Sequence, residues 1–145
     1  MKVIQIKQHI DFLESEMKDW NEYSSLTWNE YSADRKKRRE VERWIENLIN
    51  SSIDIAKLVL YLKEISQPES YAKIVAALDL VEPFSSHGKE LSKWVKLRNV
   101  ITHEYLDIRW ESIKDFIKEA RPLYEEFLGK AKELIDKEAR DEAIA

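Results

Sequence analysis

The chain has 145 residues, of which 43% are hydrophobic and 36% are charged, and its formal net charge is −4. This composition predicts one globular domain over residues 1–145. It excludes intrinsic disorder, and two glycines and three prolines are too few for an all-β fold. The acidic balance argues against general affinity for nucleic acids, so a contact with RNA requires a local basic patch.

The first part of the chain predicts two long helices. A narrow apolar stripe over residues 3–20, at alternating spacings of three and four, predicts the first helix. Residues 21–33 lose this period, and their aromatic side chains indicate an ordered connection that packs on the bundle. Asp34 is a suitable N-cap for the second helix. The apolar face over residues 41–62 is broad, which predicts a central helix with neighbours on more than one side.

Two shorter elements follow. Pro68 suits the first turn of a short third helix that ends near Leu80, with Ser66 or Gln67 before it. Residues 81–88 read as a break because they include proline and glycine. After them an apolar stripe predicts a fourth helix that ends near His103.

The last helix is predicted to begin between residues 107 and 110. Pro122 removes a backbone donor and strains the preceding turn, so we expect a bend over residues 118–122. Residues 136–145 are mostly charged and are expected to fray. Together the elements predict an all-α, up-down four-helix bundle with an additional short helix.

The most informative stretch is Arg-Asn-Val-Ile-Thr-His-Glu-Tyr over residues 98–105. Arg98 supplies a permanent, fork-shaped donor, and His103 a ring that titrates near neutral pH; together they suffice to cleave a phosphodiester. His103 would take the proton from a ribose 2′-hydroxyl or deliver one to the leaving oxygen, while Arg98 would neutralise charge on the phosphoryl oxygens. This chemistry needs no metal and no cofactor, and no helical carboxylate–histidine pattern for a metal is visible.

The spacing of these residues leaves two arrangements open. On a straight helix, residues five apart diverge by roughly 140°, so Arg98 and His103 would not share a ligand. Either the helix breaks before His103, or two copies of the motif meet across a two-fold axis. Asn99 and His103 are four apart, so Asn99 could orient the ring, and Arg98 and Thr102 form the other such pair. In a purely structural reading, Arg98 pairs with a carboxylate, His103 caps the helix end, and Tyr105 lies at the core edge.

The pattern Arg98, four residues, His103, one residue, Tyr105 resembles the signature of the HepT-like toxins of the HEPN superfamily. Three other stretches carry the resemblance, which covers residues 4–127: Glu-Arg at 42–43 with Ser-Ile-Asp-Ile-Ala at 52–56, Pro-Glu-Ser-Tyr at 68–71, and Trp-Val-Lys-Leu at 94–97. Thr102 departs from the pattern, since the family often has an apolar residue there.

The resemblance implies an all-α homodimer with its active site between the subunits. It implies a metal-independent endoribonuclease, with Arg98 and His103 catalytic, that is the toxin of a type VII-like toxin–antitoxin system. The implied antitoxin is a minimal nucleotidyltransferase of the MntA type that adds AMP to Tyr105. The added phosphate would block RNA by repulsion and by occupancy. The alternatives are a non-catalytic HEPN module that binds a nucleotide or RNA, or scaffolds the transferase, and a plain structural bundle.

A basic run that includes Arg35, Arg38 and Arg39 opens the second helix, where the helix dipole disfavours cations. This placement suggests steering of RNA, with Arg38 and Arg39 as the best phosphate contacts. The equally weighted alternative is a solvated first turn balanced by Glu40 and Glu42.

Asp54 continues a polar strip on the second helix, with Asn47 and with Asn50 or Ser51. Because the resemblance places this helix beside the motif, we expect Asp54 to line the cleft and to orient Arg98 or His103, with a structural hydrogen-bond network as the alternative.

Other residues carry weaker expectations. His9 and His87 are read as surface residues. Five tryptophans exceed what one core needs, so Trp20, Trp28 or Trp110 is expected at a subunit interface.

Three features predict a cytoplasmic protein with no membrane contact. The chain has no cysteine, which fits a reducing compartment. Its first residues lack the apolar core of a signal peptide. The longest purely apolar run, about residues 58–62, is far too short to span a bilayer.

Overall fold

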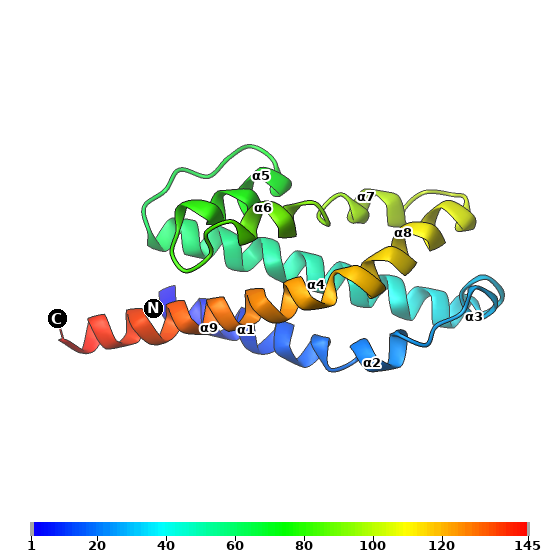
Figure 1. Cartoon of the computed structure of the whole chain (residues 1–145), viewed down its shortest axis with the longest axis horizontal. Coiled ribbons are helices and arrows are strands. Elements are labelled where there is room, and N and C mark those ends of the chain that lie inside the picture. The colour runs from blue at the N-terminus through cyan, green and yellow to red at the C-terminus, as the bar shows by residue number, and fades with distance from the viewer. Residues whose placement is uncertain (1, 145) are drawn as a thin grey trace.

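The computed structural model describes residues 2–144, and within them every regular element is helical. The long helices are α1 (Lys2–Met17), α4 (Arg35–Leu62), α8 (Leu106–Glu119) and α9 (Arg121–Ile144). The short ones are α2 (Trp20–Tyr23), α3 (Trp28–Ala33), α5 (Tyr71–Ala76), the 3₁₀ helix η1 (Ala77–Leu80), α6 (His87–Ser92) and α7 (Leu97–Ile101). Figure 1 shows an elongated bundle with α4 along its centre and α5, α6 and α7 on one side of it. The predicted all-α bundle is confirmed.

Helix α4 is the central element, as predicted. It packs against α1, α3, α5, η1 and α7. Its apolar face is buried from Val41 to Leu60. The carboxylate of Asp34 accepts hydrogen bonds from the amides of Lys36 and Lys37 at 3.0 and 3.1 Å, so the predicted N-cap is confirmed. Because α4 contacts elements on several sides, it holds the shorter helices in place relative to one another.

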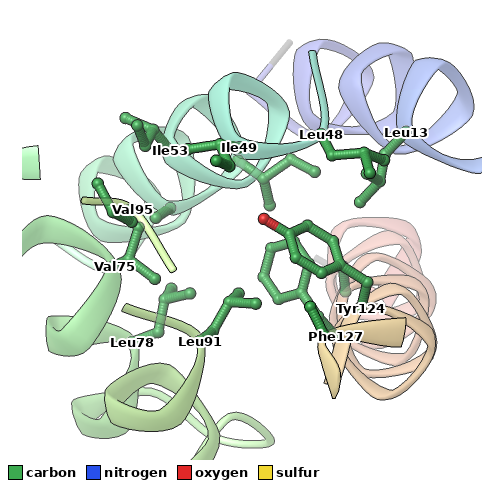
Figure 2. Packing of buried hydrophobic residues seen from close by; sticks show 14 of the residues in the cluster. Leu13, Leu48, Ile49, Ile53, Val75, Leu78, Leu91, Val95, Tyr124 and Phe127 are labelled. Atoms are coloured by element: carbon green, nitrogen blue, oxygen red, sulfur yellow. The ribbon is translucent and has the colours of Figure 1, made fainter. Parts of the chain in front are cut away.

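The core joins α1, α4, the short helices and α9 (Figure 2). Side chains from these elements and from the segment between α6 and α7 pack together: Leu13, Leu48, Ile49, Ile53, Val75, Leu78, Leu91, Val95, Tyr124 and Phe127. Full burial of one such side chain stabilises the fold by roughly 1.5–3 kcal/mol. Burial raises the pKa of Tyr124, although a hydrogen bond with Ser52 opposes the shift.

The segment between α1 and α4 is ordered, as expected. Thr27 and Glu30 form a capping box at the start of α3. Trp20 is fully buried, and its indole N–H donates to the carbonyl of Ile117 at 2.9 Å. The suggestion that Trp20 lies at a subunit interface is therefore wrong. Trp28 is 43% exposed and packs beside Trp110, with ring centres 6.2 Å apart.

The short helices differ from the prediction in two places. Helix α5 begins at Tyr71 rather than near Pro68, because Ser70 provides the cap and accepts from the amide of Lys73 at 3.2 Å. The fourth helix is divided into α6 and α7. Between them the chain makes tight i to i+3 hydrogen bonds, such as Trp94 N–H to the Leu91 carbonyl at 3.1 Å.

The last predicted helix bends where expected. Helix α8 ends before Ala120, and Pro122 lies in the first turn of α9, where its missing donor costs nothing. The expected fraying of residues 136–145 stays a prediction, and residues 136–144 are helical in the structure. Helix α9 continues through them, and Glu138 pairs with Lys63 of α4. Residue 145 lies outside the described residues.

His87 is buried rather than exposed, so its reading as a surface residue is wrong. Its ring stacks on Phe127, with centres 6.1 Å apart, and its Nδ1 lies 3.4 Å from a Glu126 carboxylate oxygen. The other ring nitrogen is buried without a hydrogen-bond partner among the described residues. Burial lowers the pKa of His87. No helix within residues 2–144 has the length and apolar character needed to cross a bilayer.

Candidate functional site

The motif over residues 98–105 lies at the end of α7. The helix ends at Ile101, and the hydroxyl of Thr102 closes it by donating to the carbonyl of Asn99 at 2.7 Å. The next residues form an exposed turn, and α8 begins after Tyr105. The helix therefore breaks before His103, which is one of the two arrangements left open by the spacing.

His103 and Tyr105 are held together within this turn. Both side chains are exposed, and their rings lie 5.4 Å apart. The backbone N–H of Tyr105 donates to Nδ1 of His103 at 3.2 Å. A nitrogen that accepts carries no proton in the neutral ring, so this bond favours the neutral tautomer with its proton on Nε2. Among the described residues, no hydrogen bond joins the side chain of Asn99 to His103.

Arg98 faces a different groove. Its guanidinium lies 5.0 Å from the centre of the Tyr71 ring, and Nζ of Lys57 lies 4.8 Å from the same centre. The groove has a volume of about 440 Å³ and runs between the start of α5 and α7, with Lys96 and Asn99 also lining it. His103 does not line this groove. Within one chain, no described contact joins the side chains of Arg98 and His103.

A hydrogen-bonded network anchors the turn from behind, and it was not predicted. Arg109, near the start of α8, donates through Nε to the carbonyl of His103. Nη1 of Arg109 donates to a carboxylate oxygen of Glu42 at 3.0 Å. The hydroxyl of Tyr31 donates to the same oxygen. Burial raises the pKa of Tyr31, and the bond to Glu42 adds to the shift. Burial disfavours the charged guanidinium and lowers the pKa of Arg109. The hydrogen bond and the negative charge of Glu42 outweigh this effect, so the pKa of Arg109 is raised.

The sequence profile of the family described as Ribonuclease HepT-like matches residues 13–131. The chain belongs to the HepT-like ribonuclease family of the HEPN superfamily. The match contains the whole of residues 98–105 as well as α4 and α8. Comparisons with curated proteins and with solved structures gave no match.

In this HepT-like chain, Asp54 lies apart from the motif. One of its carboxylate oxygens is 4.0 Å from Nδ1 of His9 on α1. The predicted polar strip lines a groove of about 340 Å³ with His9 and Phe12, not the groove of Arg98. Asp54 therefore does not orient Arg98 or His103 within one chain, because its face of α4 turns toward α1.

The basic run of the HepT-like chain divides into two groups. Arg38 donates to the carbonyls of Tyr31 and Ser32 at 3.0 and 3.1 Å, so its head satisfies the end of α3 rather than facing solvent. Both bonds use Nη1, and the role of Arg38 as a phosphate contact stays a prediction. Arg35 and Arg39 are exposed, and no partner is described for either side chain.

Sequence reasoning missed Glu42 and Arg109 because they are 67 residues apart and follow no shared period. The one available signal was that Glu42 belongs to a stretch that resembles the family. Within residues 2–144, no three His, Asp or Glu side chains gather in a way that could hold a metal ion.

Proposed function

We propose that this chain is an endoribonuclease that needs no bound metal, acts in the cytoplasm and serves as the toxin of a type VII-like toxin–antitoxin pair. One observation carries the proposal: in a chain of the HepT-like ribonuclease family, the turn that follows α7 exposes His103 and Tyr105 side by side, one helical turn beyond Arg98. An exposed imidazole, together with a guanidinium fixed in a separate groove, is suited to an extended polyanion such as RNA.

In the reaction, the ribose 2′-oxygen forms a bond to phosphorus as the bond to the 5′-oxygen breaks. His103 takes the proton from the 2′-hydroxyl while water protonates the leaving 5′-oxygen, or His103 protonates the 5′-oxygen while water takes the 2′ proton. Arg98 neutralises the charge on the non-bridging oxygens. The exposed side chains of Arg35 and Arg39 would contact phosphates further along the strand.

We assign the complete site to a homodimer. Within one chain Arg98 lies over Tyr71, while His103 lies in the turn beyond the helix and outside that groove. A two-fold pairing of the α7 ends would bring the groove of one subunit to the turn of the other. Each phosphate would then be held by Arg98 of one subunit and meet His103 of the partner subunit.

We further propose that an antitoxin of the minimal nucleotidyltransferase type, similar to MntA, silences the site through Tyr105. Tyr105 is 60% exposed, which leaves the residue open to a second protein. Attack of this oxygen on the α-phosphorus of ATP would attach AMP and release pyrophosphate. The new negative charge would be attached to Tyr105, whose ring centre lies 5.4 Å from that of His103, and would repel RNA.

The test is cleavage of RNA by purified protein in the presence of a chelator. We expect cleavage by the wild type and its loss in Arg98→Ala and His103→Ala, with circular dichroism unchanged. His9→Ala is the matched control, because His9 lies beside Asp54 in another groove. Cleavage that is absent from the wild type, or retained in both motif variants, would refute the proposal.

A non-catalytic HEPN module is the second candidate, and the separation of Arg98 from His103 within one chain favours it. In such a module, Arg98 would hold a phosphate in its groove and His103 would be dispensable. RNA binding without cleavage, lost in Arg98→Ala but kept in His103→Ala, would establish this candidate instead.

A further inference from the structure

We infer that Glu42 and Arg109 are positioning residues for His103. The proposal is that they fix the turn over residues 102–105, so that the ring keeps its proton on Nε2 and presents that nitrogen outward. It deepens the proposed function and rests on it for the catalytic consequence alone. The structural part can be tested whether or not the protein cleaves RNA.

The turn has few other attachments. The side chains of Thr102, His103, Glu104 and Tyr105 are all exposed. Among the described residues, Arg109 is the one whose side chain reaches the turn from α8 or beyond. Its bond goes to the backbone carbonyl of His103, so it constrains the main chain that carries the ring.

The shape of the guanidinium allows this single side chain to bridge two elements. Nε binds the carbonyl of His103, and a terminal nitrogen binds Glu42 on α4 at 3.0 Å. The two donors point in fixed directions from one plane, which a lysine ammonium cannot reproduce. The turn is thereby tied to α4, the central helix of the bundle.

Glu42 is itself fixed from the other side. Its carboxylate oxygen accepts from the hydroxyl of Tyr31, a residue with no exposed surface. The side chains of Arg109 and Glu42 are only 18% and 14% exposed. Removing either partner of such a shielded ion pair destabilises the local structure, because the remaining charge is left partly buried without its counter-charge.

The consequence for His103 follows from the turn it lies in. With the carbonyl of His103 held by Arg109, the amide of Tyr105 points back at Nδ1 and donates to it at 3.2 Å. This bond excludes a proton from Nδ1 in the neutral ring. Release of the carbonyl would let the turn relax, and the two neutral tautomers would then both be populated.

The decisive experiment uses protein uniformly labelled with ¹⁵N, in which the chain's three histidines give the ring signals and residues 103–105 give the amide signals. The His103 signals are assigned by their loss in His103→Ala. The variants are Glu42→Gln and Arg109→Lys. The matched control is Glu138→Gln, which removes the partner of Lys63 at the other end of α4.

In the wild type we expect one neutral tautomer for His103, with a pyrrole-like Nε2 and a pyridine-like Nδ1. In Glu42→Gln and Arg109→Lys we expect a mixture of tautomers and about tenfold faster amide exchange over residues 103–105. Glu138→Gln should leave both readouts unchanged. An unchanged tautomer and unchanged exchange in both folded variants would overturn the proposal.

The kinetic arm measures RNA cleavage by the same proteins. Misplacement of His103 should lower kcat by about 10- to 100-fold in Glu42→Gln and Arg109→Lys with little change in KM. A wild-type kcat in both variants would remove the positioning role. An inactive wild type would refute the proposed function, while the tautomer and exchange data would still decide whether the Glu42–Arg109 pair holds the turn.

Discussion

The guanidinium of Arg98 lies 5.0 Å from the centre of the Tyr71 ring, so the arginine is held over the first residue of α5. The two residues are 27 apart in the sequence, and each belongs to a stretch that resembles the family. In the proposed site, the ring would fix where the permanent charge of the motif meets a phosphate.

The first prediction concerns this contact. Tyr71→Leu removes a cation–π interaction worth about 0.5–1 kcal/mol, so RNA affinity should fall by about two- to fivefold. Tyr71→Phe keeps the aromatic face and should bind as the wild type does. Binding is measured by titration of labelled RNA with His103→Ala as the background, to prevent cleavage. Equal affinities for the Phe and Leu variants would contradict the role of the ring.

The second prediction concerns Gly88 at the start of α6. A Cβ at this position would lie 2.6 Å from the carbonyl oxygen of Val75, so Gly88→Ala should lower the free energy of unfolding by about 1–3 kcal/mol. Gly129 on α9 has nothing within 4 Å of a Cβ, so Gly129→Ala should raise the free energy of unfolding by about 0.5–1 kcal/mol through helix propensity. Urea denaturation measures both, and equal effects would contradict the packing described for α6.

The third prediction concerns pH and His87. Burial lowers the pKa of His87 and Lys130 lowers it further, against the opposing charges of Glu126 and Asp79. The folded state therefore binds this proton less readily than the unfolded state does. The stability linked to His87 is complete above the ordinary histidine pKa of about 6.5 and is lost as the pH falls below it.

His87→Leu should remove this dependence, since leucine does not titrate. Between about pH 7.5 and about pH 5, the wild type should lose more stability than the variant, as measured by the urea midpoint at each pH. His9→Leu serves as the control, because His9 is partly exposed and should leave the dependence intact. Parallel pH profiles for wild type and His87→Leu would show that the buried ring is not the cause.

The fourth prediction concerns Tyr105. Incubation with ATP and a nucleotidyltransferase of the MntA type should raise the intact mass in multiples of AMP and abolish RNA cleavage. Tyr105→Phe should keep cleavage, because its hydroxyl makes no described contact, and should resist the added mass. A mass increase on Tyr105→Phe equal to that on the wild type would place the modification elsewhere.

Periodicity predicted the long helices because their apolar residues repeat at helical spacing over many turns. The buried face of α4 is an example. The bend near Pro122 was predicted from the missing donor of proline rather than from periodicity. Periodicity failed where a few residues decide the structure. The cap at Ser70 moved the start of α5, and the ring of His87 is buried by Phe127, 40 residues further along the chain.

The candidate site likewise combines a feature that the sequence predicted with contacts that it did not. The spacing of Arg98, His103 and Tyr105 identified the turn, and the helix does end before His103. The partners of these residues came from distant parts of the chain. Tyr71 lies under Arg98, and Arg109 with Glu42 anchors the turn, through contacts that no local pattern encodes. Asp54 was placed beside the motif because it lies on α4, but its face of that helix is turned to α1.

The central claim is that Arg98 of one subunit and His103 of the partner subunit form one site. It is tested most directly by co-expressing Arg98→Ala and His103→Ala chains with different tags and purifying the heterodimer. That dimer contains one intact pairing of the two, so it should cleave RNA at about half the wild-type rate per dimer, while each mutant homodimer stays inactive. A heterodimer as inactive as the two homodimers would contradict a shared site.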